Sequence, residues 1–171
     1  MLIGIISDTH DSANNMIKAF NIFNKKKVDL ILHLGDWVSP FMLRFCKHSN
    51  SKIISIFGNN EHDRYRYPEK VKLFGVNVEF VGETAELKFD NQKFFLCHGK
   101  NKKEINSAIS SEKYDLVLSG DSHLAKIENI EKTIHINPGS TCGIKNEDIN
   151  HELTIALYDT NNNKAEIIKF E

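Results

Sequence analysis

An acidic and an imidazole side chain follow the first apolar run of this sequence. The run Leu2–Ile6 is interrupted by Ser7, and Asp8 and His10 follow two residues apart. At the tip of a strand, an Asp and a His at this spacing can bind one divalent ion together. Because Asp, Ser and Thr also begin helices as N-caps, the pair alone is a weak indication of a metal site.

Residues of the same chemical types follow four further predicted strands. They are Asp36 after residues 29–34, Asn59 after residues 52–57, His98 after residues 93–97, and Asp121 with His123 after residues 114–119. Each position by itself reads as a turn or as an isolated histidine, but independent turns have no reason to offer metal-ligand types at five strand ends. Two divalent ions about 3.5–4 Å apart, bridged by a shared carboxylate, need this mixture of oxygen and imidazole donors.

The apolar pattern of the first 57 residues predicts strands that alternate with helices. Helices are expected from Asp11 or Ser12 and from Ser39–Pro40, where Ser caps the helix and Pro occupies its first turn. In parallel sheets of this kind, ligands bind outside the carboxyl ends of the strands. The predicted elements therefore bring the polar residues to one edge.

The pattern of predicted elements changes after residue 60. Glu61–Glu69 is expected to be a loop closed by Pro68, and antiparallel pairing is expected among the short strands that follow it, with Asp90–Asn91 as a tight turn. The further predicted elements are strands at 76–81, 85–89, 93–97, 114–119, 125–130 and 133–136, a helix at 101–111, and a closing hairpin at 153–158 and 165–170. We expect one domain over residues 1–171 with an α+β fold of four layers (α/β/β/α), in which two stacked mixed β-sheets are flanked by helices.

Composition excludes several classes of protein. The net charge is −1 and the Lys and Arg residues are scattered, so a nucleic-acid partner is not expected. Cys46, Cys97 and Cys142 form no CxxC pair, which argues against a disulfide framework or a structural zinc site. No apolar run approaches the ~20 residues that span a bilayer, and the N-terminus lacks the pattern of a secretory signal. We expect no membrane partner and a cytoplasmic location.

Taken together, the motifs resemble those of the calcineurin-like metallophosphoesterase superfamily. The matching segments are SDTH (7–10), GD (35–36), GNN (58–60), HG (98–99), the GxxH of 120–123 and INPGS (136–140). They occur in the family's order over nearly the whole chain, and the resemblance is closest to the short bacterial and archaeal phosphodiesterases (YfcE-like).

The resemblance implies a divalent-metal-dependent phosphodiesterase that acts on a small phosphate ester. Two ions per chain are implied, with Mn²⁺ expected and Ni²⁺, Fe²⁺, Mg²⁺ or Zn²⁺ as alternatives. A hydroxide held between the ions would attack phosphorus in line with the leaving oxygen. The implied ligands are Asp8, His10 and His123 for the first ion, Asn59 and His98 for the second, and Asp36 as the bridge. Asn59 would also contact a phosphate oxygen.

Two positions depart from the family pattern. Asp121 stands where the family has a histidine that completes the second ion's ligands. A carboxylate either keeps that ion or leaves it weakly held, and we expect retained binding because Asp is still a donor.

Asn60 stands where relatives that act on phosphoproteins often carry a histidine that protonates the leaving group. His62 is a candidate general acid, although a solvated loop histidine is the alternative. We therefore expect faster turnover of activated aryl phosphodiesters than of alkyl phosphomonoesters.

Two other functions remain open at this point. One is a metal-poor scaffold or binding module of the same fold, like the scaffold subunit of the retromer coat, and the other is a phosphomonoesterase. The edge strands of the closing hairpin would suit a homodimer. Trp37 is expected to pack over the site or its rim, and Asn137–Ser140 is expected to form a turn that supports the His123 segment.

Overall fold

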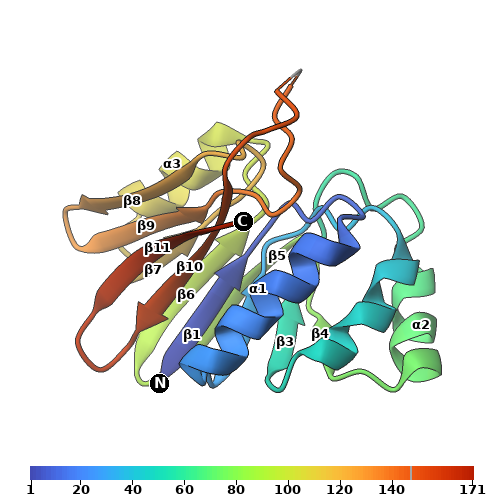
Figure 1. The fold of residues 1–171 in the computed structure, drawn as a ribbon. Coiled ribbons are helices and arrows are strands. Elements are labelled where there is room, and N and C mark those ends of the chain that lie inside the picture. The colour runs from blue at the N-terminus through green and yellow to red at the C-terminus, as the bar shows by residue number, and fades with distance from the viewer. Residues whose placement is uncertain (147) are drawn as a thin grey trace.

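Two β-sheets stacked face to face form the centre of the molecule (Figure 1). The computed structural model describes residues 1–146 and 148–171. Its elements are β1 (Leu2–Ile6), α1 (Ala13–Lys26), β2 (Leu30–His33), the 3₁₀ helix η1 (Pro40–His48), β3 (Lys52–Ser55), α2 (Arg66–Phe74), β4 (Val78–Phe80), β5 (Thr84–Phe89), β6 (Gln92–Cys97), α3 (Lys102–Ser110), β7 (Leu116–Leu118), β8 (Ala125–Ile130), β9 (Thr133–Pro138), β10 (Leu153–Asp159) and β11 (Lys164–Phe170).

Both sheets are mixed. The first has the order β11-β10-β1-β2-β3-β4 and the second the order β5-β6-β7-β9-β8. The parallel strands β1 to β4 occupy one side of the first sheet, and β6, β7 and β9 are parallel in the second. The expected α+β class with two mixed sheets is therefore confirmed.

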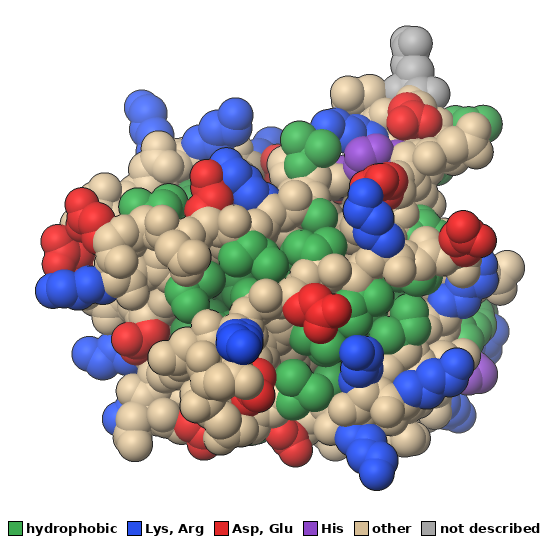
Figure 2. Space-filling view, turned by 60° about the vertical axis from the view of Figure 1, so that its left-hand side comes forward, with side chains coloured by type: hydrophobic (Ala, Val, Ile, Leu, Met, Phe, Trp, Pro, Cys, Tyr) green, Lys and Arg blue, Asp and Glu red, His purple; other side chains and the backbone are tan. Residues whose placement is uncertain are grey.

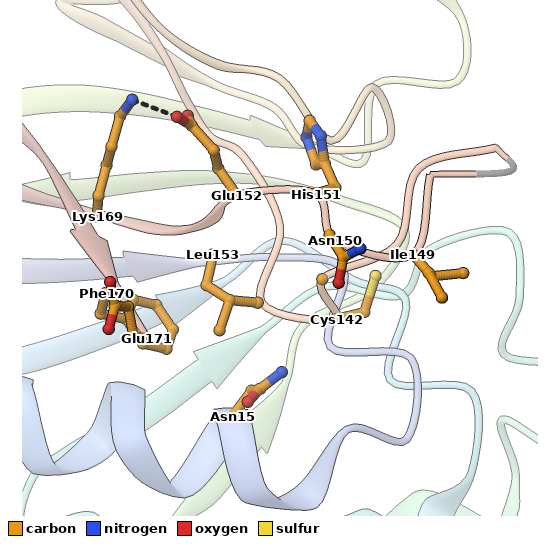
Figure 3. A pocket seen from close by; sticks show the side chains of 11 residues that line it. Asn15, Cys142, Ile149, Asn150, His151, Glu152, Leu153, Lys169, Phe170 and Glu171 are labelled. Carbon is orange, nitrogen blue, oxygen red and sulfur yellow. Dashed lines mark hydrogen bonds and ion pairs between the residues drawn. The ribbon is translucent and has the colours of Figure 1, made fainter.

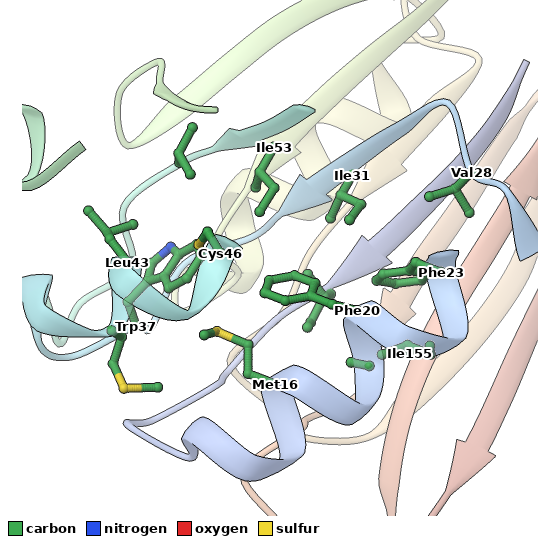
Figure 4. Close-up of a cluster of buried hydrophobic side chains, with 14 of the residues drawn as sticks. Met16, Phe20, Phe23, Val28, Ile31, Trp37, Leu43, Cys46, Ile53 and Ile155 are labelled. Atoms are coloured by element: carbon green, nitrogen blue, oxygen red, sulfur yellow. The ribbon is translucent and has the colours of Figure 1, made fainter. Parts of the chain in front are cut away.

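Two hydrophobic layers hold the sheets and helices together. The inner layer fills the space between the sheets, with Ile5 and Leu32 of the first sheet and Leu96 and Leu118 of the second fully buried. The outer layer joins the first sheet to α1, η1 and α2 (Figure 4). Because both faces of β1 and β2 are covered, these strands are apolar without alternation.

Helices cover the outer faces of both sheets, as the four-layer prediction requires. The helical periodicity of α1 places Met16, Phe20 and Phe23 on one buried face against the first sheet. The single helix α3 packs on β6 and β7 of the second sheet. Within the described residues, no helix is long and apolar enough to cross a membrane.

The segment after Asn60 differs from its prediction in two ways. Pro68 does not close a loop but lies in the first turn of α2, which begins at Arg66. Proline is tolerated there because the first N–H groups of a helix have no intrahelical acceptor. Strand β4 pairs with β3 in parallel rather than antiparallel, because α2 carries the chain back across the sheet. The expected antiparallel hairpin occurs one step later, between β5 and β6.

Trp37 also differs from its prediction. Its ring is fully buried in the outer hydrophobic layer rather than placed over the site or its rim. It stacks on the His33 ring with centroids 3.8 Å apart, and its Nε1–H donates to Ser55 Oγ at 2.9 Å. Burial lowers the pKa of His33 to about 3, so this histidine is a neutral core residue.

Candidate metal centre

The loops after β1 and β2 are joined by backbone hydrogen bonds. Asp8 N donates to Gly35 O at 3.1 Å, and His10 N donates to Asp36 O at 3.0 Å. Asp121 N, from the loop after β7, donates to Asp8 Oδ2 at 3.1 Å. Ligand candidates from both sheets are thereby fixed at the end of β1 that lies away from the N-terminus (Figure 1).

Five candidate ligands have a left-handed backbone. Their φ angles are 53° for Asp8, 38° for His10, 61° for Asp36, 61° for Asp121 and 57° for His123. This conformation is unfavourable for residues other than glycine, although Asp and His adopt it more readily than most. It recurs at sites where surrounding bonds over-determine the backbone for a functional reason.

One group of donors contains Asp8, His10 and His123. His123 Nε2 lies 3.5 Å from Asp8 Oδ1 and 3.2 Å from His10 Nε2. His10 Nε2 lies 3.8 Å from Asp8 Oδ1. Three donor atoms at these separations can share one ion, and these are the residues expected to hold the first one.

The second group contains Asp8, Asp36 and His98. His98 Nε2 lies 3.3 Å from Asp36 Oδ1 and 3.5 Å from Asp121 Oδ1. The other oxygen of Asp36 lies 3.4 Å from His10 Nε2, so this carboxylate spans both groups as a bridge would. Asp8 Oδ1 is also within 4.0 Å of His98 Nε2, which places it closer to the second group than the sequence suggested.

Orphaned polar atoms test whether these residues fit divalent ions. Asp8 Oδ1, Asn59 Oδ1 and His98 Nε2 are all buried without a hydrogen-bond partner. Such atoms are rare in folded proteins and each demands a partner. Carboxylate, amide and imidazole donors are the ligands of Mn²⁺, Fe²⁺ and related ions. The donor set therefore fits divalent metal ions, and Asn59 lies beside His98 in the lining of the same small hollow.

Outer hydrogen bonds orient two of the imidazoles. The Nδ1 atom of His98 lies 2.8 Å from Leu34 O, and that of His123 lies 2.6 Å from Ile144 O. Donation from Nδ1 to a carbonyl leaves Nε2 of each ring as the free ligand atom. The tautomers needed for metal binding are thus imposed by the backbone.

In the metal-free protein, the imidazoles and carboxylates of the cluster shift each other's pKa values. Burial would lower the pKa of His98, but Asp36 and Asp8 outweigh it and raise the pKa to about 9. Burial is likewise outweighed at His123, where Asp8 and Cys142 raise the pKa to about 10. Burial would raise the pKa of Asp8, but the nearby imidazoles of His10, His123 and His98 outweigh it and hold that pKa well below its usual range. A divalent ion must therefore displace protons from these imidazoles.

Glu61 is a structural residue of the site that sequence reasoning missed. Its side chain is 2 % exposed, and its carboxylate accepts hydrogen bonds from Trp37 N, Val38 N and Gly58 N. It therefore ties the loop that carries Asp36 to the loop that carries Asn59. Burial and the nearby charge of Asp36 raise the pKa of Glu61. An acid directly after the GNN segment was the available signal.

Asn60 has a second role that the sequence did not reveal. Its backbone N–H donates to Asp36 Oδ1 at 3.0 Å and its side-chain amide donates to Asp36 Oδ2 at 2.6 Å. The residue that cannot protonate a leaving group thus fixes the bridging carboxylate. Gly58 is needed beside it, because a Cβ atom there would collide with Asp36.

The remaining predicted positions lie outside the two donor groups. His62 is exposed and belongs to neither donor group. Asn137 Nδ2 donates to Gly120 O at 2.7 Å, and Ser140 Oγ donates to Asp8 O at 2.9 Å. The segment 137–140 therefore supports the loops after β7 and β1, as expected of a supporting turn.

A further hollow lies apart from most of these ligands (Figure 3). It encloses about 580 Å³ between the start of α1, the β9–β10 connection and the end of β11. Lys169 and Glu152 form an ion pair at its edge, 2.6 Å apart. Two residues that line this hollow contact His123 of the first donor group: Cys142 Sγ lies 3.8 Å from its Nδ1, and His151 Nε2 lies 2.7 Å from its backbone oxygen.

Comparisons with known proteins point to one family. Residues 1–163 match the calcineurin-like phosphoesterase superfamily domain. A phosphodiesterase of Methanocaldococcus jannaschii is 38 % identical over 144 residues, which cover 84 % of this chain and 86 % of that protein. The structure of an archaeal phosphodiesterase superposes with a TM-score of 0.90 at 34 % identity over 99 % of this chain and all of the other. The YfcE phosphoesterase of E. coli shares the fold, with a TM-score of 0.67 at 17 % identity over the whole of both chains.

Proposed function

Because the chain belongs to the calcineurin-like phosphoesterase superfamily, we propose that it is a divalent-metal-dependent phosphodiesterase acting on small phosphate esters. The observation that carries this proposal is the set of buried, unpartnered donor atoms at Asp8, Asn59 and His98, which lie in the segments that follow β1, β3 and β6. The likeness to archaeal phosphodiesterase, in sequence and in structure, supports a diester as the substrate.

Two ions fit the donor set, with Mn²⁺ as the expected metal. Asp8, His10 and His123 would hold the first ion, Asn59, His98 and Asp121 would hold the second, and Asp36 would serve both. When bound, the ions supply an activated water as nucleophile and neutralise charge on the phosphoryl oxygens. The residues 1–171 act as one domain, since the ligands come from both sheets.

The protein's own groups orient the centre and the substrate. Asn60 and Glu61 fix Asp36 and its loop, and the Asn59 amide would contact a phosphate oxygen. Asn60 cannot protonate a leaving group, and His62 is exposed. A leaving group that departs as a stable anion needs no such acid. We therefore expect aryl phosphodiesters to be better substrates than alkyl phosphomonoesters.

The test is hydrolysis of bis(p-nitrophenyl) phosphate by chelator-treated protein to which Mn²⁺ or Ni²⁺ is returned. We expect activity that depends on the added metal and is lost in the variant Asp36→Asn. A matched control is Asp29→Asn, which changes a carboxylate that accepts from Leu2 N far from the ligands. Absence of hydrolysis with every divalent metal would favour the alternative of a scaffold. A higher rate on alkyl phosphomonoesters would favour a phosphomonoesterase.

A further inference from the structure

A second hollow opens directly beside the candidate metal centre. It encloses about 390 Å³ between α3, the loop after β7 and strands β8 and β9. Asp121, whose carboxylate lies 3.5 Å from His98 Nε2, forms part of its wall. A group bound in this hollow would therefore lie next to a phosphate held at the centre.

Apolar side chains form part of the walls of this hollow, beside polar and charged ones. Ile105 and Ile109 line it from α3, and Ile130 lines it from β8. Leu124 contributes a further apolar side chain that is 50 % exposed. Volumes of 300–1,000 Å³ with apolar walls and a few polar groups are typical of small-molecule sites. These walls favour a flat, weakly polar ring over a sugar or an ion alone.

The polar groups on the sheet side of the hollow carry little net charge. His135 Nε2 lies 2.9 Å from Ser119 Oγ, and burial lowers the pKa of His135, which keeps the ring neutral. The carboxylate of Glu128 is neutralised by Lys126 at 2.7 Å. Charge recognition in this hollow therefore depends on the residues at its mouth.

The mouth of the hollow is positively charged. Lys100 and Lys102 both line it, both are exposed, and neither forms an ion pair with a carboxylate in residues 1–146 or 148–171. Figure 2 views the side of the molecule that carries α3 and β8, where hydrophobic side chains reach the surface among both basic and acidic side chains. An anionic group at this mouth would meet two unpaired ammonium groups.

Lys100 also connects this hollow to the metal ligands. With Gly99 it lines a smaller hollow of about 190 Å³ that contains Asn59 and His98. The two hollows thus lie on either side of the Gly99–Lys100 segment, immediately after a candidate ligand. A phosphodiester has two ester groups, and this arrangement offers a separate space to each.

We propose that the hollow between α3 and β8 binds one ester group of the substrate, and that this group carries a ring and a further negative charge, as a nucleotide unit does. The proposal rests on the proposed function and names the substrate class of the same site. The ring packs against Ile105 and Ile109, and the additional anion lies at Lys102. The scissile phosphate remains at the metal ligands.

The first test compares two charge-reversed variants in binding experiments with metal-loaded protein. The probes are thymidine 3′,5′-bisphosphate, which has a ring and a second anion, and inorganic phosphate, which reports on the metal centre alone. We expect Lys102→Glu to weaken bisphosphate binding about tenfold and to leave phosphate binding unchanged, since reversal replaces an attraction by a repulsion. Lys103→Glu is the matched control, because Lys103 is exposed in the same turn of α3 but lines neither hollow.

The second test measures the cleavage of two related substrates and the effect of filling the hollow with a larger side chain. We expect wild-type protein to cleave dithymidylate with a terminal phosphate about tenfold faster, as kcat/KM, than dithymidylate without it, and Lys102→Glu to remove this preference. Asn106→Trp, which fills the hollow from an exposed position of α3, should weaken bisphosphate binding, whereas Lys103→Trp should not.

The experiments can contradict the proposed function and the substrate class assigned to the hollow independently of each other. If no phosphodiester is cleaved with any metal, the proposed function is wrong, and the bisphosphate measurements still decide whether the hollow binds a charged ring. If diesters are cleaved but Lys102→Glu and Lys103→Glu behave alike with both probes, the substrate class assigned to the hollow is wrong.

Discussion

Asp121 is the residue at which the candidate metal centre departs from the family pattern that the sequence otherwise resembles. Its carboxylate faces His98 Nε2 at 3.5 Å and its side chain is 34 % exposed. The position therefore offers an oxygen donor where the family pattern has an imidazole. Mn²⁺ and Mg²⁺ prefer hard oxygen ligands to softer ones. We expect the second ion to be retained, with a more anionic set of ligands.

Removal of the Asp121 carboxylate tests this expectation. The variant Asp121→Ala should lose about one bound metal ion per chain, because the second ion then keeps fewer donors. Elemental analysis after dialysis against limiting Mn²⁺ gives the stoichiometry. Asp121→His should retain both ions, and Glu131→Ala, which removes an exposed carboxylate in the β8–β9 turn, should behave like wild type. Unchanged stoichiometry in Asp121→Ala would remove this residue from the ligand set.

Individual donors were accessible to sequence reasoning because each stands at the end of an apolar strand. Asp8, Asp36, His98 and His123 needed no more than strand periodicity and the rule that carboxyl ends gather at one edge. Glu61 and Asn60 were not accessible in this way. Their partners are groups of the Asp36–Val38 loop, 23 or 24 residues away, and strand or helix periodicity does not report such contacts.

At the level of elements, the centre depends on how two loops are held together. Val38 has a φ of 75°, which is a strained value for a β-branched residue. Its N–H and that of Trp37 both donate to the Glu61 carboxylate, whose other oxygen accepts from Gly58 N at 2.5 Å. One buried carboxylate thus stabilises a strained loop and joins it to its neighbour.

Neutralising this carboxylate should cost stability as well as metal affinity. In Glu61→Gln, the amide nitrogen must face a backbone N–H donor, so at least one buried donor loses its acceptor. We expect the free energy of unfolding to fall by about 1–3 kcal/mol in urea denaturation, with weaker Mn²⁺ binding by titration.

Glu79→Gln provides the comparison for Glu61→Gln. Glu79 lies on β4 in an exposed ion pair with Lys52 at 2.5 Å, and exposed pairs contribute little, so its loss should change stability by less than about 1 kcal/mol. Equal effects of the two substitutions would show that Glu61 does not hold the loops.

The errors of element prediction share one physical origin. Strand β4 and helix α2 form a short crossover at the edge of the first sheet, where Tyr67 of α2 is fully buried under η1. The polar residues that surround Tyr67 hide this helix in the sequence, since tertiary packing rather than periodicity determines it. The hairpin at Asp90–Asn91 was predictable because its turn requires residues that accept a positive φ, here 46° and 67°.

For the molecule as a whole, the protons of the metal-free centre link stability to pH. The pKa values of His98 and His123 are about 9 and about 10 in the folded protein, above the ~6.5 of an unfolded histidine. Their contribution to stability is fully present below pH ~6.5 and is lost as the pH rises through the folded values. Asp8, whose pKa is lowered, contributes above pH ~4 and stays constant across this range.

We therefore expect the metal-free protein to become less stable between pH 6.5 and pH 10. The fall should amount to at least about 1 kcal/mol, measured as the unfolding midpoint in urea at fixed ionic strength. With saturating Mn²⁺ the trend should reverse, because metal binding requires deprotonated imidazoles and strengthens as protons leave. A metal-free protein whose stability rises with pH over this interval would contradict the assigned ion pairs.

The left-handed backbone at the ligands has a consequence beyond coordination. Asp8, His10, Asp36, Asp121 and His123 all occupy a region that disfavours side chains, at a cost on the order of 1 kcal/mol for each residue. Glycine would relieve this strain at every one of these positions and would abolish the chemistry at each. Selection for heat resistance and selection for turnover therefore act in opposite directions on the same five residues.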